Sequence, residues 1–280
     1  MSVKEKVLHH LTRSDFARRA YGTLLRVPVL GTGFQKIIHT ALPRGKSMWI
    51  RIPEGLANDF WIYADPRLEL GYTNGDHEPW LQELLKSHLR LGDCFFDVGA
   101  HTGFFILVAS RFVGPPGNII AFEPDPENAA TLRKNLSKNG LTQVVLIEAA
   151  AWSSTGQTIF EREVGISNRT RGHIPDESNS DSVINVPAIC IDDVVFERGY
   201  PRPNFIKLDV EGAEWQALHG ACRVLSEVKP KLLCEVHDGS QMSEIQNYLR
   251  QFDYVVEEWS PSHPHYPDYH QLYIWAVPRS

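Results

Sequence analysis

Apolar positions follow two patterns along the chain, and the order of these patterns predicts an α/β fold. From residue 94 onward, short runs that are almost continuously apolar alternate with longer segments of helical periodicity. Strands of this kind are typical of a parallel sheet that helices cover on both faces. Seven strands are predicted, at residues 94–97, 119–123, 144–151, 204–210, 231–237, 254–258 and 271–277.

Helical segments fall between several of these runs. Asp125 is a favourable N-cap, Pro126 suits the first helical position, and Gly140 can end that helix. Further helices are predicted at residues 78–89, 213–226 and 241–252. The last two strands leave no room for a covering helix between them, so one of them should run antiparallel at the edge of the sheet.

Other regions depart from this alternation. Residues 1–45 predict one or two helices, because apolar residues recur there at helical spacing. Residues 48–53 and 60–65 alternate in polarity and predict a β-hairpin. Residues 164–185 show little periodicity and predict a long loop, of the kind that often serves as a lid or a binding loop.

Composition places limits on the class of protein. The 280 residues, 42% of them hydrophobic, suffice for one large domain or one domain with an appendage. The sequence holds no apolar run of the roughly 18 residues that span a bilayer, and its amino terminus lacks the apolar block of a signal peptide. The four cysteines form no C-x-x-C pair, so no zinc-ligand spacing is present. We therefore expect a soluble, cytoplasmic protein with reduced thiols.

Charge is distributed unevenly along the chain. The net charge of −6 gives no reason to expect nucleic acid as the main partner. Residues 1–50 nevertheless hold nine Lys or Arg against two acidic residues, a local charge of +7. A basic amino-terminal arm of this kind is either a solvated segment or one that contacts an anionic membrane surface or an acidic partner.

The first candidate for chemistry is Cys-Phe-Phe-Asp-Val-Gly-Ala-His-Thr-Gly at residues 94–103, which predicts a buried strand, a tight turn and a helix. Gly99 and Gly103 would let the backbone approach a ligand where a Cβ would block it. Such a ligand lies outside the carboxyl end of the strand. Asp97 suits a ligand that carries an ammonium group. A purely structural turn is the alternative, since many α/β folds contain one.

A second acid, Glu123, ends the next strand, 26 residues after Asp97. An acid in that position can accept hydrogen bonds from both hydroxyls of a ribose. Together the two carboxylates describe a site for a nucleoside with a cationic tail, which fits S-adenosylmethionine. The glycine pattern G-x-x-x-G also differs from the G-x-G-x-x-G pattern of dinucleotide sites.

A third motif carries a family resemblance. The stretch Phe-Ile-Lys-Leu-Asp-Val-Glu-Gly-Ala-Glu at residues 205–214, with Asp-Val-Gly-Ala-His-Thr-Gly, Ala-Phe-Glu-Pro and Cys-Glu-Val-His, resembles the FkbM family of S-adenosylmethionine-dependent methyltransferases. The resemblance covers roughly residues 75–278. It implies a class I methyltransferase fold, with a Rossmann-like, seven-stranded and mostly parallel sheet. It also implies two parts: an amino-terminal extension (1–74) and a methyltransferase domain (75–280). Family members of known activity are mostly O-methyltransferases that act on sugars, glycolipids or polyketides.

The resemblance also implies roles for individual residues. It places the methionine part and the methyl group of the cofactor beside Asp209, and the ribose beside Glu123. The remaining residues implied for the cofactor site are Asp97, Gly99, His101 and Gly103 in the first loop, Pro124 after the second strand, Glu148 and Ala149 near the adenine, and Tyr72, Asn74, His77 and Glu78 in a segment that closes over the cofactor.

Methyl transfer to an alcohol requires a means of removing the hydroxyl proton, which is either a general base or a metal ion that acidifies the hydroxyl. Asp209 is the first candidate for the base, and Glu211 and His237 follow. Asp209 could instead position the cofactor without accepting a proton. Carboxylates such as Glu211 and Glu214 also favour a helix start whatever the function. Lys207, inside an apolar strand, should pair with one of these acids.

Two loops are candidates for acceptor binding. His263, His265 and His270 match no defined metal motif, so we predict no metal site there and leave a metal requirement open. With Tyr266, Asp268 and Tyr269 they are more typical of a lid that contacts the substrate. Cationic residues of the long loop could bind an anionic group of the substrate or lie in solvent; they are Arg162, Arg169, Arg171 and His173.

The sequence thus predicts an S-adenosylmethionine-dependent O-methyltransferase whose acceptor is a small molecule or a glycan. Two alternatives stay open at this point. One is a scaffold protein that uses the methyltransferase fold without catalysis. The other is a nicotinamide-dependent oxidoreductase, against which the missing G-x-G-x-x-G pattern argues.

Overall fold

The computed structural model describes residues 46–66, 68–161, 183–263 and 266–279, with side chains left out over 262–270. The predicted helices and basic arm of residues 1–45 lie outside the described residues. So do most of the predicted long loop and its arginines. The chain divides into two compact units, residues 1–79 and 80–280. The division into parts at residue 74 stays a prediction.

The described part of the first unit contains the predicted hairpin. Strands β1 (Met48–Arg51) and β2 (Trp61–Ala64) pair antiparallel, and helix α4 (Leu70–Asn74) follows. The helix ends at Gly75, whose φ is +92°. A Cβ there would lie 2.0 Å from the carbonyl oxygen of Glu54, so the close approach of helix end and hairpin requires glycine.

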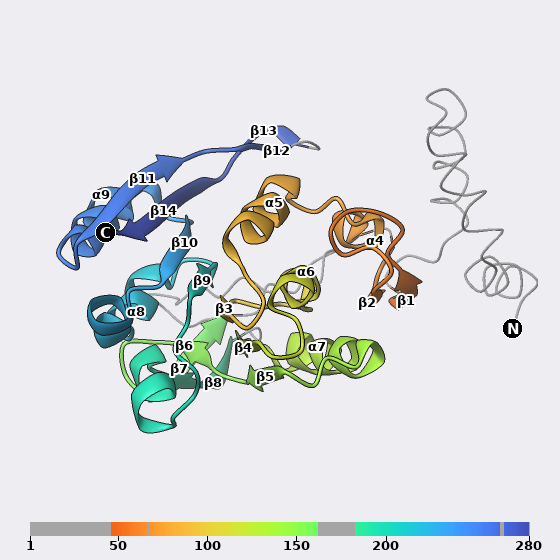
Figure 1. The fold of residues 1–280 in the computed structure, drawn as a ribbon, viewed down its shortest axis with the longest axis horizontal. Helices are drawn as coiled ribbons and strands as arrows, with labels where there is room; N and C mark the ends of the chain where they lie inside the picture. Colours follow the sequence, from red (N-terminus) through yellow and green to blue (C-terminus); the bar gives the residue numbers. More distant parts are fainter. Residues whose placement is uncertain (1–45, 67, 162–182, 264–265, 280) are drawn as a thin grey trace, which may run out of the picture. The chain divides into compact units, whose positions relative to one another are not determined.

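The second unit is built on a seven-stranded sheet, which confirms the predicted fold class (Figure 1). The strand order is β11-β14-β10-β9-β3-β4-β5. The antiparallel pairing predicted near the edge is made by β14, which runs against β10 on one side and against β11 on the other. The strands are β3 (Cys94–Val98), β4 (Asn118–Phe122), β5 (Val144–Ile147), β9 (Phe205–Leu208), β10 (Lys231–Val236), β11 (Tyr254–Trp259) and β14 (Leu272–Pro278).

Helices occur where the periodicity predicts them. In α7 the carboxylate of Asp125 accepts the N–H groups of Glu127 and Asn128, and the helix ends at Gly140 in the left-handed conformation. The predicted helix at 213–226 is shorter, since α8 stops at His219 and a separate π-helical turn spans Val224–Val228. The helices are α5 (Pro79–His88), α6 (Phe104–Val113), α7 (Pro126–Asn139), α8 (Glu214–His219) and α9 (Met242–Arg250). Among the described residues, none of the helices has the length and apolar character of a membrane span.

The prediction of one strand over residues 144–151 is wrong. The chain turns at Glu148, and β6 (Ala150–Ala151) joins a separate three-stranded sheet with β7 (Gly156–Glu161) and β8 (Val183–Ile189). Residues 183–185, predicted as loop, belong to β8. Most of the side chains of β7 are at least partly exposed, so this sheet lacks the continuous apolar runs that reveal the central strands.

The core of the second unit lies around the middle strands of the large sheet. All five residues of β3 and all four of β9 are buried. Because β3, β4, β9 and β10 are neighbours and run parallel, their carboxyl ends meet at one edge of the sheet. The polar residues that follow these four strands are therefore brought together there.

Candidate functional site

The turn between β3 and α6 is shaped by two glycines in the left-handed region. Gly99 has a φ of +85° and Gly103 one of +91°. A Cβ on Gly99 would lie 1.7 Å from the carbonyl oxygen of Asp209, and one on Gly103 would lie 2.3 Å from Cδ1 of Leu132. The sequence predicted close approach to a ligand, but both glycines also permit close approach to the protein itself. At Gly99 the backbone of the turn packs directly against the end of β9.

Glu123 lies directly after β4 and is buried. Its carboxylate accepts the backbone N–H of His101 at 2.7 Å and that of Asp125 at 2.9 Å, one on each oxygen. Burial raises the pKa of Glu123 to about 7, although these donors pull it down. The Oε1 atom also accepts a hydrogen bond from Nδ2 of Asn128 at 3.4 Å, which leaves Oε2 as the oxygen that can accept a further hydrogen bond.

Lys207 lies at the centre of the site, and its side chain is only 5% exposed. Its Nζ atom is 3.3 Å from Oδ1 of Asp97 and 3.1 Å from Oδ2 of Asp209, and it donates to the carbonyl of Gly99. The predicted pairing of this buried lysine with an acid is confirmed. Burial raises the pKa of Asp97 to about 6 in spite of the neighbouring ammonium group. Lys207 therefore occupies the cationic position beside Asp97 that the sequence assigned to a ligand.

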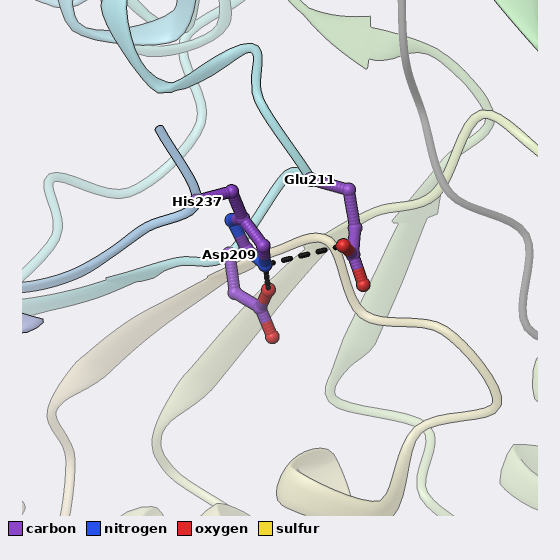
Figure 2. A group of neighbouring side chains, drawn as sticks. All are labelled: Asp209, Glu211 and His237. Carbon is purple, nitrogen blue, oxygen red and sulfur yellow. Dashed lines mark ion pairs between the residues drawn. The ribbon is translucent and has the colours of Figure 1, made fainter. Parts of the chain in front are cut away.

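His237, directly after β10, lies beside the carboxylates of Asp209 and Glu211 (Figure 2). Its Nδ1 atom lies 2.7 Å from Oε1 of Glu214. Its Nε2 atom lies 3.2 Å from Glu211, 3.5 Å from Glu235 and 3.7 Å from Asp209. Burial disfavours the charged imidazole, but the hydrogen bond to Glu214 and the nearby carboxylates outweigh it and raise the pKa of His237 to about 10. The ring is then protonated at neutral pH, which makes His237 a poor proton acceptor.

Glu214 holds both His237 and the turn after β9 in place. It is fully buried at the start of α8, and its Oε1 atom also accepts the N–H of Gly212 at 2.9 Å. Glu211, which directly precedes Gly212, has a φ of +53°, a conformation rare for a residue other than glycine. Glu214 thus holds both the turn after β9 and the ring of His237, so it positions the site from within the protein.

Glu235 is a site residue that sequence reasoning missed. It is buried, and its carboxylate accepts the side chains of Gln271 at 2.9 Å and Tyr273 at 3.1 Å. A sequence signal for it exists, because an acid within the run Leu-Leu-Cys-Glu-Val, two residues before His237, points to the same face of the sheet. Asp209 and Lys207 are related by the same spacing.

Other predicted residues are less closely tied to this cluster. Glu148 is exposed and forms an ion pair with Arg133, and Ala149 beside it is buried. Pro124 follows Glu123 on the same turn. In the first unit, Glu78 is buried and the rings of Tyr72 and His77 lie edge to face. The roles of these residues and of Asn74 in cofactor binding stay predictions, and the side chains of the predicted histidine-rich lid lie outside the described residues.

Comparison with known proteins places this chain in a family. The model of the methyltransferase FkbM domain matches residues 97–256, which include both glycine-rich and acidic motifs and His237. The chain belongs to the FkbM methyltransferase family. This confirms the resemblance carried by the three sequence motifs. It also favours a methyltransferase over the nicotinamide-dependent oxidoreductase.

Two curated relatives are similar to this chain at low identity. Hexuronic acid methyltransferase AglP of Haloferax volcanii is 27% identical over 59% of this chain and 65% of its own length. The chain thus spans just under two thirds of that relative. The 31-O-demethyl-FK506 methyltransferase FkbM of Streptomyces tacrolimicus is 26% identical over 62% of this chain and 77% of its own length. The crystal structure of methyltransferase FkbM from Methylobacillus flagellatus KT has a TM-score of 0.49 and 21% identity, and covers 70% of this chain and 51% of that one.

We predict that Gly99→Ala destabilises the protein. The new Cβ would collide with the carbonyl of Asp209 and force alanine into the left-handed region, at a cost of about 2 kcal/mol or more in the free energy of unfolding. Gly156→Ala is the matched control, because a Cβ there meets nothing within 4 Å, and its effect should stay within about 0.5 kcal/mol. Urea unfolding measures both. Equal stability of the two variants would contradict the close approach of the turn to β9.

We also predict that Lys207→Met is strongly destabilising, by about 3–5 kcal/mol at pH 8, because it leaves the buried carboxylate of Asp97 without its cation. The pKa of Asp97, already above its unfolded value, should rise further in this variant. A raised carboxyl pKa gives stability that is lost as the pH rises through it, so the defect should be smaller at pH 5 than at pH 8. Urea unfolding at both pH values tests this. Asp97→Asn in the Lys207→Met background should restore part of the loss; no restoration would argue against the pair.

Proposed function

We propose that this protein transfers a methyl group from S-adenosylmethionine to a hydroxyl group of a sugar-like or other polyhydroxylated acceptor. The observation that carries the proposal is that Glu123 after β4 and Asp209 after β9 both contact the Gly99–His101 turn after β3, which lies between these two strands, in an FkbM-family chain. The names of the two curated relatives, a hexuronic acid methyltransferase and a 31-O-demethyl-FK506 methyltransferase, support an oxygen acceptor.

The residues present fit the cofactor. Two backbone N–H groups and the side chain of Asn128 orient the carboxylate of Glu123, and Oε2, which accepts one of these N–H groups, can also accept a ribose hydroxyl. The turn at Gly99 and His101 runs directly beside this carboxylate. When bound, the cofactor supplies an electrophilic methyl group on a positively charged sulfur. An edge rich in carboxylates suits that charge.

The end of β9 is the part of the site suited to the acceptor hydroxyl. Lys207 holds Oδ2 of Asp209, while Oδ1 faces His237 and the side chain stays 28% exposed. We assign Asp209 to deprotonation or positioning of the hydroxyl, with Glu211 as the next candidate. With the cofactor bound, the methyl group would pass from the sulfur to the acceptor oxygen, which would lose its proton. The products are a methyl ether, S-adenosylhomocysteine and a proton.

We predict that Glu123→Ala weakens S-adenosylmethionine binding about 10- to 100-fold, because the charged hydrogen-bond acceptor for the ribose is lost. Calorimetric titration with S-adenosylmethionine and S-adenosylhomocysteine measures the change, with NADH as the negative ligand. Glu127→Ala, an exposed acid in the same segment, is the control and should bind as the wild type does.

Circular dichroism must show that Glu123→Ala is folded, since Glu123 also accepts two backbone N–H groups. Unchanged affinity in a folded variant would remove Glu123 from the cofactor site. No binding of either cofactor form by the folded wild type would overturn the methyltransferase proposal and favour the scaffold.

We expect Asp209→Asn to lower kcat about 100-fold or more if Asp209 accepts the hydroxyl proton. The affinity for S-adenosylmethionine should change only a few-fold, because asparagine keeps an oxygen that can face Lys207. The assay measures S-adenosylhomocysteine formation on a panel of uronic acid glycosides and polyols. An equal loss in cofactor affinity and in kcat would show that Asp209 positions the cofactor instead.

A further inference from the structure

Three side chains at the ends of β9 and β10 present metal-ligand atoms to one point in space. Asp209, Glu211 and His237 each offer one such atom, and the three atoms lie within 4.8 Å of one another (Figure 2). The Nε2 atom of His237 is 3.2 Å from Oε2 of Glu211 and 3.7 Å from Oδ1 of Asp209. Donors that are each about 2.1 Å from one ion are separated by about 3.0–3.4 Å. Small side-chain adjustments would therefore complete the coordination.

A second observation points to a ligand at this position. Two of the three donors have their other polar atom fixed by a group that is buried: Glu214 holds Nδ1 of His237, and Lys207 holds Oδ2 of Asp209. Metal sites commonly show this arrangement, in which a carboxylate orients the histidine and a hydrogen bond orients each ligating carboxylate. The Oδ1 atom of Asp209 and the Nε2 atom of His237 are thereby held close to each other and to Oε2 of Glu211.

We propose that Asp209, Glu211 and His237 form a binding site for a divalent transition-metal ion. One imidazole with two carboxylates favours Mn²⁺ or Zn²⁺ over Ca²⁺ and Mg²⁺, which prefer oxygen ligands alone. The site has open positions, since three protein ligands leave at least one for an exogenous oxygen. Its charge also fits, because four carboxyl groups surround the imidazole, and a divalent cation that displaces the proton from Nε2 of His237 offsets their repulsion.

The role of such an ion rests on the proposed function. Bound at the acceptor end of the site, it would hold the acceptor hydroxyl and lower its pKa, so that a strongly basic side chain is not needed. Glu214 and Lys207 are then positioning residues for the ion. The binding of the ion itself does not depend on the methyltransferase activity.

Metal binding is tested directly on the full-length protein after treatment with a chelator and its removal. Mn²⁺ is titrated by electron paramagnetic resonance of the free ion, and Zn²⁺ by calorimetry, both without cofactor. We expect one saturable site per chain for at least one of the two ions. Glu211→Gln and His237→Ala should weaken binding at least tenfold, and Glu214→Gln, which acts through His237, about tenfold. Glu244→Gln, an exposed acid on α9, is the matched control and should bind as the wild type does.

Absence of saturable binding for both ions, or equal binding by wild type and the Glu211→Gln and His237→Ala variants, would overturn the metal site. The cluster would then hold a protonated histidine alone. Calorimetric titration of the same chelator-treated protein with S-adenosylmethionine separates the two proposals. Cofactor binding without metal binding leaves the proposed function in place, whereas metal binding without cofactor binding removes only the methyltransferase role.

Discussion

Burial of the Lys207 ammonium group between two carboxylates is the constraint on which the rest of the site depends. A buried charge of this kind is stable only when its partners are held in place, because desolvation costs several kcal/mol per ion. Asp97 and Lys207 are register partners on neighbouring strands, so the ion pair fixes β3 against β9. It also holds the end of β9 so close to the turn after β3 that only glycine fits at residue 99.

The same face of the sheet carries a second charged centre on β10, the strand that neighbours β9. Glu235 and His237 are two residues apart on β10 and its end, as Lys207 and Asp209 are on β9 and its end, so both pairs point to one side. The acids around His237 outnumber the cations that face them. An edge of this composition favours a cationic ligand, whether the sulfonium of a cofactor or a metal ion.

Much of this architecture could be predicted from sequence because it depends on periodicity and on local motifs. The continuous apolar runs gave the strands of the central sheet, and Asp125 and Gly140 marked the ends of α7. The small sheet was missed because most residues of β7 are at least partly exposed and its partner β8 follows a long insertion. The environment of His237 was missed for a different reason. Its partners Glu214 and Glu235 come from separate elements, and a protonation state depends on distances that spacing does not report.

The cofactor end of the site, at Glu123, and the acceptor end, at Asp209 and His237, are held in place by different kinds of groups. Two main-chain N–H groups hold the carboxylate of Glu123, with one longer hydrogen bond from the side chain of Asn128. At the acceptor end, the side chain of Lys207 holds Asp209, and the side chain of Glu214 holds His237. These two contacts are linked because Asp209 also faces His237. A substitution at the cofactor end should therefore act locally. One at the acceptor end should change the charge and position of several neighbours, because each carboxylate there shares its cation with another.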